Sequence, residues 1–115
     1  AQSVALIGDV RGKDCIIFDD EIATGGSIKE AARILRQFGA AQVRVGITHA
    51  ILSGNAPEIL ANAELDELVV TDTIPVSAEK RSSIPNLRVL STAKLFGDAI
   101  LRIHGGRSLS EMMEA

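Results

Sequence analysis

Short apolar runs alternate along this chain with longer stretches in which apolar residues recur at helical spacing. The short runs are rich in Ile, Val and Leu and predict strands over Ser3–Ile7, Cys15–Phe18, Val43–Thr48, Glu67–Thr71 and Leu87–Leu90. A run such as Cys15–Phe18 is typical of a parallel strand that is covered on both faces. The alternation of strands and helices predicts an α/β fold with a largely parallel sheet.

Three helices are expected between and after these strands. The first spans about Gly26–Phe38 and ends at Gly39, because glycine suits a helix C-terminus. The second begins at Asn55, which is a good N-cap residue. The third begins at Ser91 or Thr92, and its apolar residues are expected to face the core: Leu95, Phe96, Ala99, Ile100 and Ile103.

The remaining segments predict turns and loops. Gly8–Asp14 predicts a turn between the first two strands, with Gly and Asp where a positive φ costs little. Thr73–Pro85 contains two prolines and a charged run, so we expect a solvated loop there. One further helical turn is expected within Ser108–Met113.

The stretch after Phe18 carries the clearest chemistry. Asp19, Asp20 and Glu21 follow the strand directly, and Thr24–Ser27, with the sequence Thr-Gly-Gly-Ser, opens the first helix. Backbone N–H groups of such a loop, together with the positive end of the helix, form a cradle for a phosphate. The carboxylates are suited to accept hydrogen bonds from ribose hydroxyls or to hold Mg²⁺. The alternative is that Ser27 and Glu30 form a helix capping box, in which Ser27 only caps.

Loops that leave the carboxyl ends of parallel strands lie at one edge of the sheet, where ligands bind. The segments Asp19–Ser27, His49–Asn55 and Thr71–Thr73 all follow predicted strands, so we expect them to share one rim. His49 lies at such a strand end, and both a structural and a functional role are open for it.

Composition limits the classes of function. The 115 residues suit one domain, and a net charge of −3 gives no reason to expect nucleic acid or a membrane surface as a partner. Cys15 is the single cysteine, so no intrachain disulfide forms, and it is expected to be buried. No apolar run is long enough to span a bilayer, and no signal peptide is visible, so we expect a cytoplasmic location. The chain starts at Ala1 without an initiator Met, as a piece of a longer protein would.

Phe18–Ser27 resembles the loop that binds phosphoribosyl pyrophosphate (PRPP) in type I phosphoribosyltransferases and in ribose-phosphate pyrophosphokinases. Further stretches resemble the pyrophosphokinase family specifically: Ile7–Lys13, Thr48–Ala56, Ala99–His104 and Ser108–Ser110. The resemblance implies a Rossmann-like domain of the phosphoribosyltransferase type, with a parallel sheet in a three-layer α/β/α arrangement.

The resemblance also implies an activity. Enzymes of this family, also called PRPP synthetases, move the diphosphoryl group of ATP to ribose 5-phosphate with Mg²⁺. Their subunit has two similar domains and forms homo-oligomers, and residues 1–115 resemble the C-terminal domain. The ribose 5-phosphate residues carried over are Asp19, Asp20, Ala23, Thr24, Gly25, Gly26 and Ser27, with Asp19 and Asp20 also placed toward the metal. Ser27 replaces a more usual Thr, and Ala23 replaces a frequent Asp. Ser108 and Ser110 lie in the tail, which in the family helps to form a regulatory phosphate site between subunits.

Two alternatives stay open. A type I phosphoribosyltransferase would need a base-recognition hood, for which no segment is found. A non-catalytic regulatory module related to PRPP synthetase would keep the fold without turnover. In the family the nucleotide-binding residues and a basic catalytic loop lie upstream, and Lys80–Arg81 does not match that loop. We therefore expect an upstream domain to bind ATP and the isolated chain to be inactive.

Overall fold

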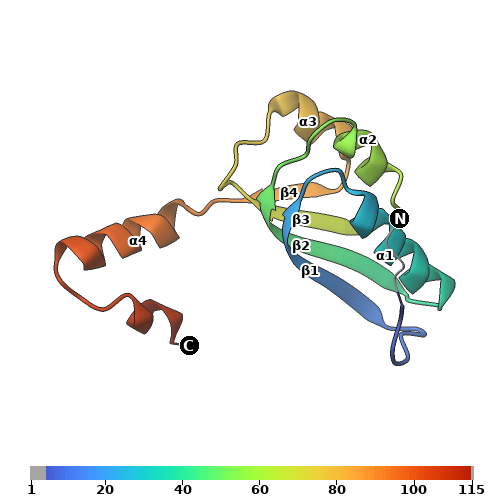
Figure 1. Ribbon diagram of the computed structural model, residues 1–115, viewed down its shortest axis with the longest axis horizontal. Coiled ribbons are helices and arrows are strands. Elements are labelled where there is room, and N and C mark those ends of the chain that lie inside the picture. Colours follow the sequence, from blue (N-terminus) through green and yellow to red (C-terminus); the bar gives the residue numbers. More distant parts are fainter. Residues whose placement is uncertain (1–4, 115) are drawn as a thin grey trace.

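The computed structural model describes residues 5–114 and shows an α/β fold built on one parallel sheet (Figure 1). The four strands are β1 (Asp14–Ile22), β2 (Gln42–Ala50), β3 (Glu67–Thr71) and β4 (Leu87–Leu90). The helices are α1 (Gly26–Gln37), α2 (Ala56–Ala61), α3 (Ala78–Ser83) and α4 (Ala93–His104), followed by the short 3-10 helix η1 (Ser110–Met113). The predicted α/β class and the parallel sheet are confirmed.

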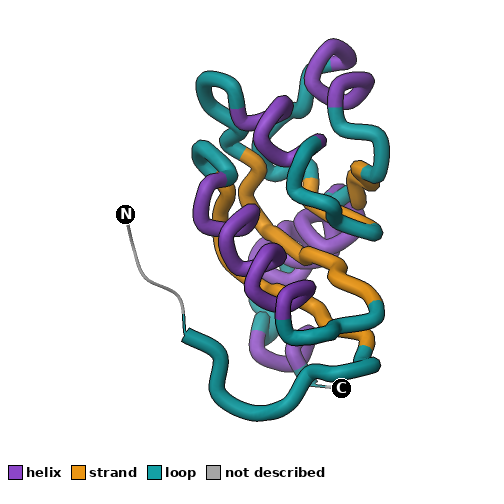
Figure 2. The backbone as a smooth tube through the Cα atoms, turned by 90° about the vertical axis from the view of Figure 1, so that its right-hand side faces the viewer, coloured by secondary structure: helices purple, strands orange, loops and turns teal. Residues whose placement is uncertain are grey.

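The order of the strands decides which face of the sheet the helices cover. Neighbouring strands follow the sequence, β1-β2-β3-β4, and every neighbouring pair is parallel. Since crossovers between parallel strands are right-handed, three crossovers in the same direction place α1, α2 and α3 on one face. Figures 1 and 2 show these helices together on that side. Within residues 5–114 the chain thus forms two of the three predicted layers, and the second face of the sheet is not covered by its own helices.

The core lies between the sheet and this helical layer. Alternate residues of β2 point toward the helices, and Val43, Val45 and Ile47 are buried. Leu68 and Val70 of β3 continue the same surface. The helices and loops contribute further buried side chains, among them Ile28, Ala32, Leu52, Ala56, Leu60 and Ile84.

The opposite face of β1 is open, which corrects the prediction of a strand covered on both sides. Ile16 is 57% exposed and Phe18 is 79% exposed. Cys15 is half-buried rather than fully buried. Apolar composition identified the strand, but it did not tell whether a second helical layer exists to cover it.

Two further expectations are wrong. Of the predicted strand Ser3–Ile7, residues 5–7 form no strand, and the first two residues lie outside the described part. The N–H of Gly12 donates to the carbonyl of Gly39 at 2.8 Å, so the segment that precedes β1 passes beside the C-terminal end of α1. The predicted loop Thr73–Pro85 contains helix α3, which is capped by the Ser77 hydroxyl accepting the N–H of Lys80 at 3.2 Å.

Helix α4 forms where it was expected, but it does not face the core. It extends away from the sheet, with the tail beside it (Figure 1). Its side chains Leu95, Phe96, Ile100 and Ile103 are all exposed. Within the described residues, no helix has the length and apolar character needed to cross a bilayer.

Candidate functional site

A cavity of about 260 Å³ lies where β1 leads into α1. Its lining is one continuous segment, Asp19 to Gly25, followed by Ser27 and Ile28. Six of the seven residues that the sequence assigned to ribose 5-phosphate therefore line one cavity. The seventh, Gly26, is the first residue of α1 and joins the two parts of that lining.

The two glycines of the loop have different structural roles. Gly25 is the N-cap of α1 and has a φ of 87°, in the left-handed region that favours glycine. A Cβ atom there would lie 3.1 Å from Cγ of Leu60, which is buried below the loop. At Gly26 the nearest atom to an added Cβ would be the hydroxyl of Thr24 at 3.9 Å, an ordinary contact. Gly25 therefore sets the turn, whereas Gly26 leaves open space beside the cavity.

The start of α1 presents unpaired backbone donors to this cavity. Gly25 has no side chain that can cap, and no side-chain cap bond forms. Among the described residues, none supplies an acceptor for the N–H groups of residues 25–28, whereas the N–H of Lys29 pairs with Gly25 at 3.0 Å. Four N–H groups without a backbone acceptor and the positive end of a three-turn helix therefore lie at the cavity, and helix starts of this kind bind anions.

The capping-box alternative for Ser27 is wrong. Ser27 is the second residue of α1 rather than its N-cap. The Glu30 carboxylate does not reach back to the helix start, because Arg33 binds both of its oxygens, at 2.7 and 2.9 Å. That ion pair lowers the pKa of Glu30 on the solvent side of α1. The Ser27 hydroxyl is thus not used for capping.

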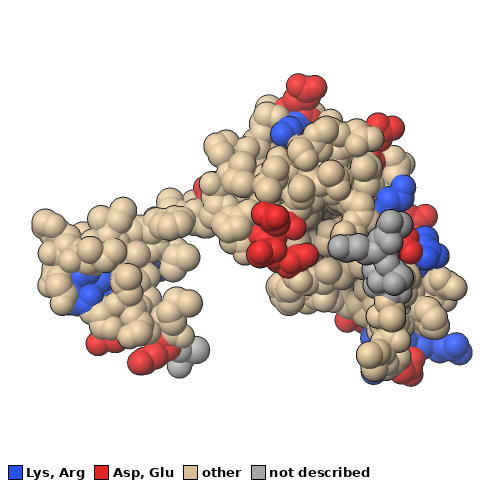
Figure 3. Space-filling model, viewed as in Figure 1, with Lys and Arg blue, Asp and Glu red and all other residues tan. Residues whose placement is uncertain are grey.

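Three acidic residues also line the cavity. Asp19, Asp20 and Glu21 are exposed, and the Asp20 N–H donates to the Asp19 carboxylate at 2.8 Å. Figure 3 shows acidic side chains gathered over this end of the sheet. The lining includes no Lys, Arg or His. An anion in the cavity therefore meets both backbone donors and negative charge, so a cation would strengthen its binding.

The loop after β2 holds the first loop in place. The Ser53 N–H and hydroxyl both donate to the carbonyl of Ala23, at 2.8 and 3.2 Å. The N–H groups of Ile51 and Leu52 donate to the carbonyl of Ile22, at 3.0 and 3.1 Å. Because these bonds turn the two carbonyls away from the cavity, the N–H groups that follow can face it. The prediction that both loops share one rim is confirmed.

The third strand end joins the same rim. His49 Nδ1 and the Thr73 hydroxyl lie 2.8 Å apart, and the Thr71 hydroxyl donates to the carbonyl of Thr48 at 2.6 Å. The Thr73 hydroxyl also donates to that carbonyl at 3.2 Å, and the direction of its bond with Nδ1 of His49 depends on the tautomer of the ring. His49 thus has a structural partner, and its Nε2 is left for other interactions.

Sequence reasoning missed two contacts of this rim. Ser53 lies inside the quoted segment Thr48–Ala56, but only the fold brings it to Ala23. Asp72 is the second case. Its carboxylate accepts the N–H and hydroxyl of Thr92, at 2.8 and 2.6 Å, and these bonds lower its pKa. No sequence signal connects the residues of either pair, because each pair is joined by the topology of the sheet.

Comparison with known proteins identifies the family. A family model described as the phosphoribosyl synthetase-associated domain matches residues 2–114. The chain belongs to this family. The resemblance noted in the sequence is therefore confirmed over nearly its whole length.

Relatives and a solved structure agree with this assignment. The domain is 49% identical over 107 residues to ribose-phosphate pyrophosphokinase of Xanthomonas campestris pv. campestris, covering 93% of this chain and 33% of that protein. It is 45% identical over 115 residues to the Marinomonas sp. pyrophosphokinase, covering 100% of this chain and 36% of that protein. The crystal structure of phosphoribosylpyrophosphate synthetase from Mycobacterium smegmatis matches 87% of this chain and 33% of its own, with a TM-score of 0.83 and 43% identity. The chain thus spans about a third of these proteins.

The tail of this phosphoribosyl synthetase-associated domain lies apart from the cavity. The hydroxyls of Ser108 and Ser110 are 2.7 Å apart. Arg102 of α4 donates to the Ser108 carbonyl and to Glu111, both at 3.1 Å. Hydrogen bonds thus join the tail to α4, and the tail lies beside that helix rather than beside the sheet (Figure 1).

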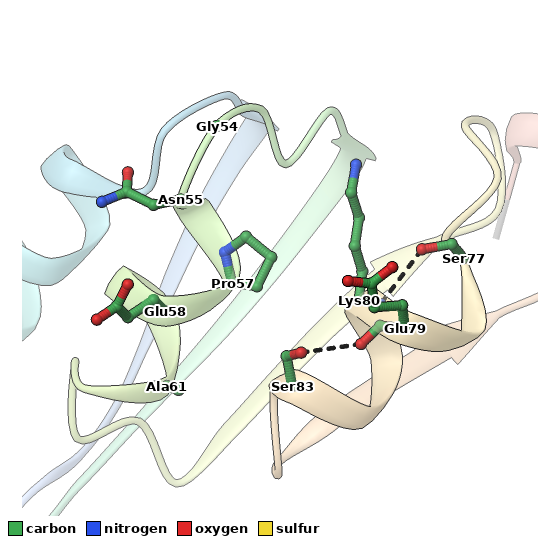
Figure 4. Close-up of a pocket in the computed structure, with 9 residues that line it drawn as sticks. All are labelled: Gly54, Asn55, Pro57, Glu58, Ala61, Ser77, Glu79, Lys80 and Ser83. Atoms are coloured by element: carbon green, nitrogen blue, oxygen red, sulfur yellow. Dashed lines mark hydrogen bonds between the residues drawn. The ribbon is translucent and has the colours of Figure 1, made fainter.

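A second hollow lies between α2 and α3 and has a volume of about 500 Å³ (Figure 4). Its lining mixes Glu58 and Glu79 with Lys80 and small polar residues. The hydrogen bonds drawn there stay within α3 and its cap, such as the Ser83 hydroxyl to the Glu79 carbonyl at 2.9 Å. Its lining residues belong to two short helices and to the residues just before them, and none of the residues predicted to bind ribose 5-phosphate, metal or a regulatory phosphate lies among them.

Proposed function

We propose that this domain binds ribose 5-phosphate and Mg²⁺ as the sugar-phosphate half of a ribose-phosphate pyrophosphokinase. The observation that carries the proposal is that the N–H groups of residues 25–28, which have no backbone acceptor among the described residues, lie at the same cavity as Asp19 and Asp20. The relatives named above are pyrophosphokinases rather than phosphoribosyltransferases, which favours this function over the transferase alternative.

The two sets of groups suit the two ends of the sugar phosphate. A 5-phosphate in the cradle accepts hydrogen bonds from the helix start and from the hydroxyls of Thr24 and Ser27. The carboxylates of Asp19 and Asp20 accept hydrogen bonds from ribose hydroxyls. Ala23 offers no side-chain acceptor, so in this domain the sugar depends on the two aspartates. Because the phosphate binds at the start of α1 and the hydroxyls bind at the aspartates, the sugar has one orientation. Its anomeric carbon points away from α1.

The carboxylates at this cavity suit Mg²⁺ better than a metal that requires many protein ligands. Within residues 5–114, no three side chains of the His, Cys, Asp or Glu type converge on one metal position. Mg²⁺ is usually held by one or two carboxylates, with waters and substrate oxygens completing its shell. Asp19 and Asp20 supply that number of carboxylates. The ion, when bound, would neutralise charge between these carboxylates and the phosphate groups of the reactants.

The proposed reaction needs a second half-site. The anomeric hydroxyl of ribose 5-phosphate attacks the β-phosphorus of ATP, the bond from that phosphorus to the α–β bridging oxygen breaks, and AMP leaves. Such transfers depend on positioning and on cations around the moving group. The described cavity lining supplies no basic side chain for that purpose. ATP is therefore assigned to the part of the enzyme that lies outside this third of its length.

NMR titration of the ¹⁵N-labelled chain with ribose 5-phosphate, with and without Mg²⁺, tests the proposal. We expect the largest shifts at the amides of residues 25–28 and tighter binding with Mg²⁺. Ser27→Ala removes one hydrogen bond to a charged group, worth about 1.5–3 kcal/mol, and should weaken binding at least ten-fold. Ser82→Ala is the matched control, because its hydroxyl only bonds the Glu79 carbonyl in α3. Shifts confined to other regions, or equal affinities of the two variants, would contradict the site.

A further inference from the structure

The loop after β2 contains a leucine in a backbone conformation that leucine rarely adopts. Leu52 has a φ of 52°, in the left-handed region, where the Cβ atom of an L-residue crowds the following carbonyl. Among the non-glycine residues of the described range 5–114, only Glu64 shares a positive φ. Glu64 is exposed, whereas Leu52 is 1% exposed. A strained residue persists only where its surroundings enforce the conformation, and such residues gather at functional sites.

The buried side chain of Leu52 enforces this conformation. It belongs to the same core cluster as Ile22, Ile28 and Leu60. Two residues later, Gly54 also has a positive φ, of 57°, which glycine adopts at no steric cost. Glycine at position 52 would make the turn without strain, but it would have no side chain to hold the loop against the core. The leucine is therefore both the strained residue and the anchor of the loop.

This turn directs three consecutive N–H groups toward the loop after β1 (Figure 1). The N–H groups of residues 51 and 52 donate to the Ile22 carbonyl, at 3.0 and 3.1 Å. The N–H of Ser53 donates to the Ala23 carbonyl at 2.8 Å, and the carbonyl of Ser53 accepts the N–H of Ala56 at 3.1 Å. Because φ of residue 52 sets the angle between the N–H of Leu52 and the chain that follows, a negative φ would move Ser53 away from Ala23.

We infer that Leu52 is a positioning residue for the cradle at the start of α1, and that Ser53 transmits its effect. The inference rests on the function proposed above. Leu52 orients the donors of its own loop, those donors hold the carbonyls of Ile22 and Ala23, and the N–H groups of residues 25–28 begin only two residues after Ala23. The loop therefore has its binding shape before a ligand arrives. A sugar phosphate then does not have to order this loop on binding, an ordering that would otherwise reduce its affinity.

Alanine and glycine at position 52 separate the backbone effect from burial. Leu52→Ala and Leu52→Gly remove nearly the same buried side chain, but only glycine adopts a φ of 52° without steric cost. In the ligand-free 115-residue chain, we expect amide hydrogen exchange at Ser53 to be about ten-fold faster in Leu52→Ala than in Leu52→Gly, as the penalty for a left-handed L-residue implies. The amide NMR shifts of residues 25–28 should also change more in Leu52→Ala. If burial alone mattered, alanine would protect Ser53 at least as well as glycine, and that result would overturn the inference.

Glu64 supplies the matched control. Its φ of 56° is nearly the same, but its carbonyl is bound by Arg36 in the last turn of α1, at the other end of that helix from the cradle. Glu64→Ala and Glu64→Gly should therefore give the same amide shifts at residues 25–28 and the same exchange at Ser53. If the two Glu64 variants differ there as much as the two Leu52 variants do, the cradle responds to any left-handed residue, and the role of Leu52 is refuted.

Substitutions at Ser53 test the transmission, and they decide the question if neither Leu52 variant folds. Ser53 is exposed, so Ser53→Ala and Ser53→Thr remove no buried side chain. Threonine keeps a hydroxyl that can donate to the Ala23 carbonyl. We therefore expect the amide shifts of residues 25–28 to stay close to wild type in Ser53→Thr and to change in Ser53→Ala. Equal shifts in the two variants would contradict the inference.

Titration with ribose 5-phosphate and Mg²⁺ connects the shape of the cradle to binding. We expect Leu52→Ala to bind about ten-fold more weakly than Leu52→Gly, and Ser53→Ala to bind several-fold more weakly than Ser53→Thr. A wild-type chain that does not bind ribose 5-phosphate would contradict the proposed function alone, because the exchange and shift measurements on the ligand-free chain still decide on Leu52. A wild type that binds, together with equal affinities of the two Leu52 variants, would show that Leu52 does not position the cradle.

Discussion

The two glycines of the cradle should respond in opposite directions to the same substitution. Gly25→Ala places a methyl group at a φ of 87°, and the left-handed conformation costs an L-residue about 1–2 kcal/mol. The new Cβ would also lie 3.1 Å from Leu60 Cγ, and Leu60 is 2% exposed and cannot move far. Crowding of this kind costs about 1–3 kcal/mol. We expect Gly25→Ala to lower the free energy of unfolding by about 2–5 kcal/mol.

Gly26→Ala should instead be neutral or stabilising. Its φ lies outside the left-handed region, and the added methyl has only the Thr24 hydroxyl within 4 Å, at 3.9 Å. Replacing glycine by alanine at a compatible position typically stabilises by about 0.4–1 kcal/mol, because the unfolded chain loses freedom. The two neighbouring substitutions should therefore differ by at least about 2 kcal/mol.

Urea unfolding followed by circular dichroism, at one fixed protein concentration, measures both values. The double variant Gly25→Ala/Leu60→Ala separates crowding from backbone strain. If crowding contributes, the double variant loses less stability than the sum of the single losses, by about 0.5–3 kcal/mol. A loss below about 0.5 kcal/mol for Gly25→Ala, or equal values for both glycines, would refute this account of the turn.

Three further outcomes are expected. The N–H of Val43 and the guanidinium of Arg36 hold the pKa of Asp66 below its usual range. The stability that the Asp66 carboxylate contributes is therefore present above the unfolded pKa of about 3.9, and it is lost as the pH falls through the lower pKa of the folded state. In the Asp66→Asn variant, the free energy of unfolding should therefore fall less steeply below about pH 4 than it does in the wild type. Equal pH dependence of the free energy of unfolding in both proteins would contradict this. Asp19→Asn and Asp20→Asn should each lower the Mg²⁺-dependent affinity for ribose 5-phosphate about ten-fold by calorimetry, without changing the urea midpoint; unchanged affinity would remove both carboxylates from the site. The isolated chain should form no PRPP or AMP from ATP, Mg²⁺ and ribose 5-phosphate. If the wild-type chain forms product and the Gly26→Val variant does not, the upstream part of the enzyme is not required for the reaction.

The bounds of two strands could be predicted from their short apolar runs. Glu67–Thr71 and Leu87–Leu90 form strands with the predicted bounds. By contrast, β1 and β2 continue past their apolar runs to Ile22 and Ala50, because parallel pairing extends through polar residues. Hydrophobic pattern has no signal for such an extension.

What covers an element could not be predicted from periodicity. The spacing of apolar residues in α4 correctly indicated a helix, but it did not indicate that Leu95, Phe96, Ile100 and Ile103 would be exposed rather than facing the core. Within residues 5–114, the helices between the strands all lie on one face of the sheet because of the strand order, which the pattern does not encode. Helix α3 was missed because its six residues bury no side chain, and only Ser77 marks its start.

The sequence could point to this cavity because the residues that line it are local in sequence. Thr24–Ser27 and the preceding carboxylates lie within one short segment, and the fold only bends it. The different roles of Gly25 and Gly26 were not visible, since φ and the position of Leu60 are properties of the folded chain.

The hydrogen bonds from Ser53 to Ala23 have a consequence for protein engineering. The shape of the cradle depends on main-chain donors that lie 30 residues further along the chain. Transplanting residues 19–27 alone into another parallel sheet would move the side chains without the groups that orient their backbone. The smallest portable unit is therefore β1, β2 and the loops after both strands, with Leu60 beneath Gly25. Recombination that separates these two loops should yield a folded protein without a preformed anion pocket.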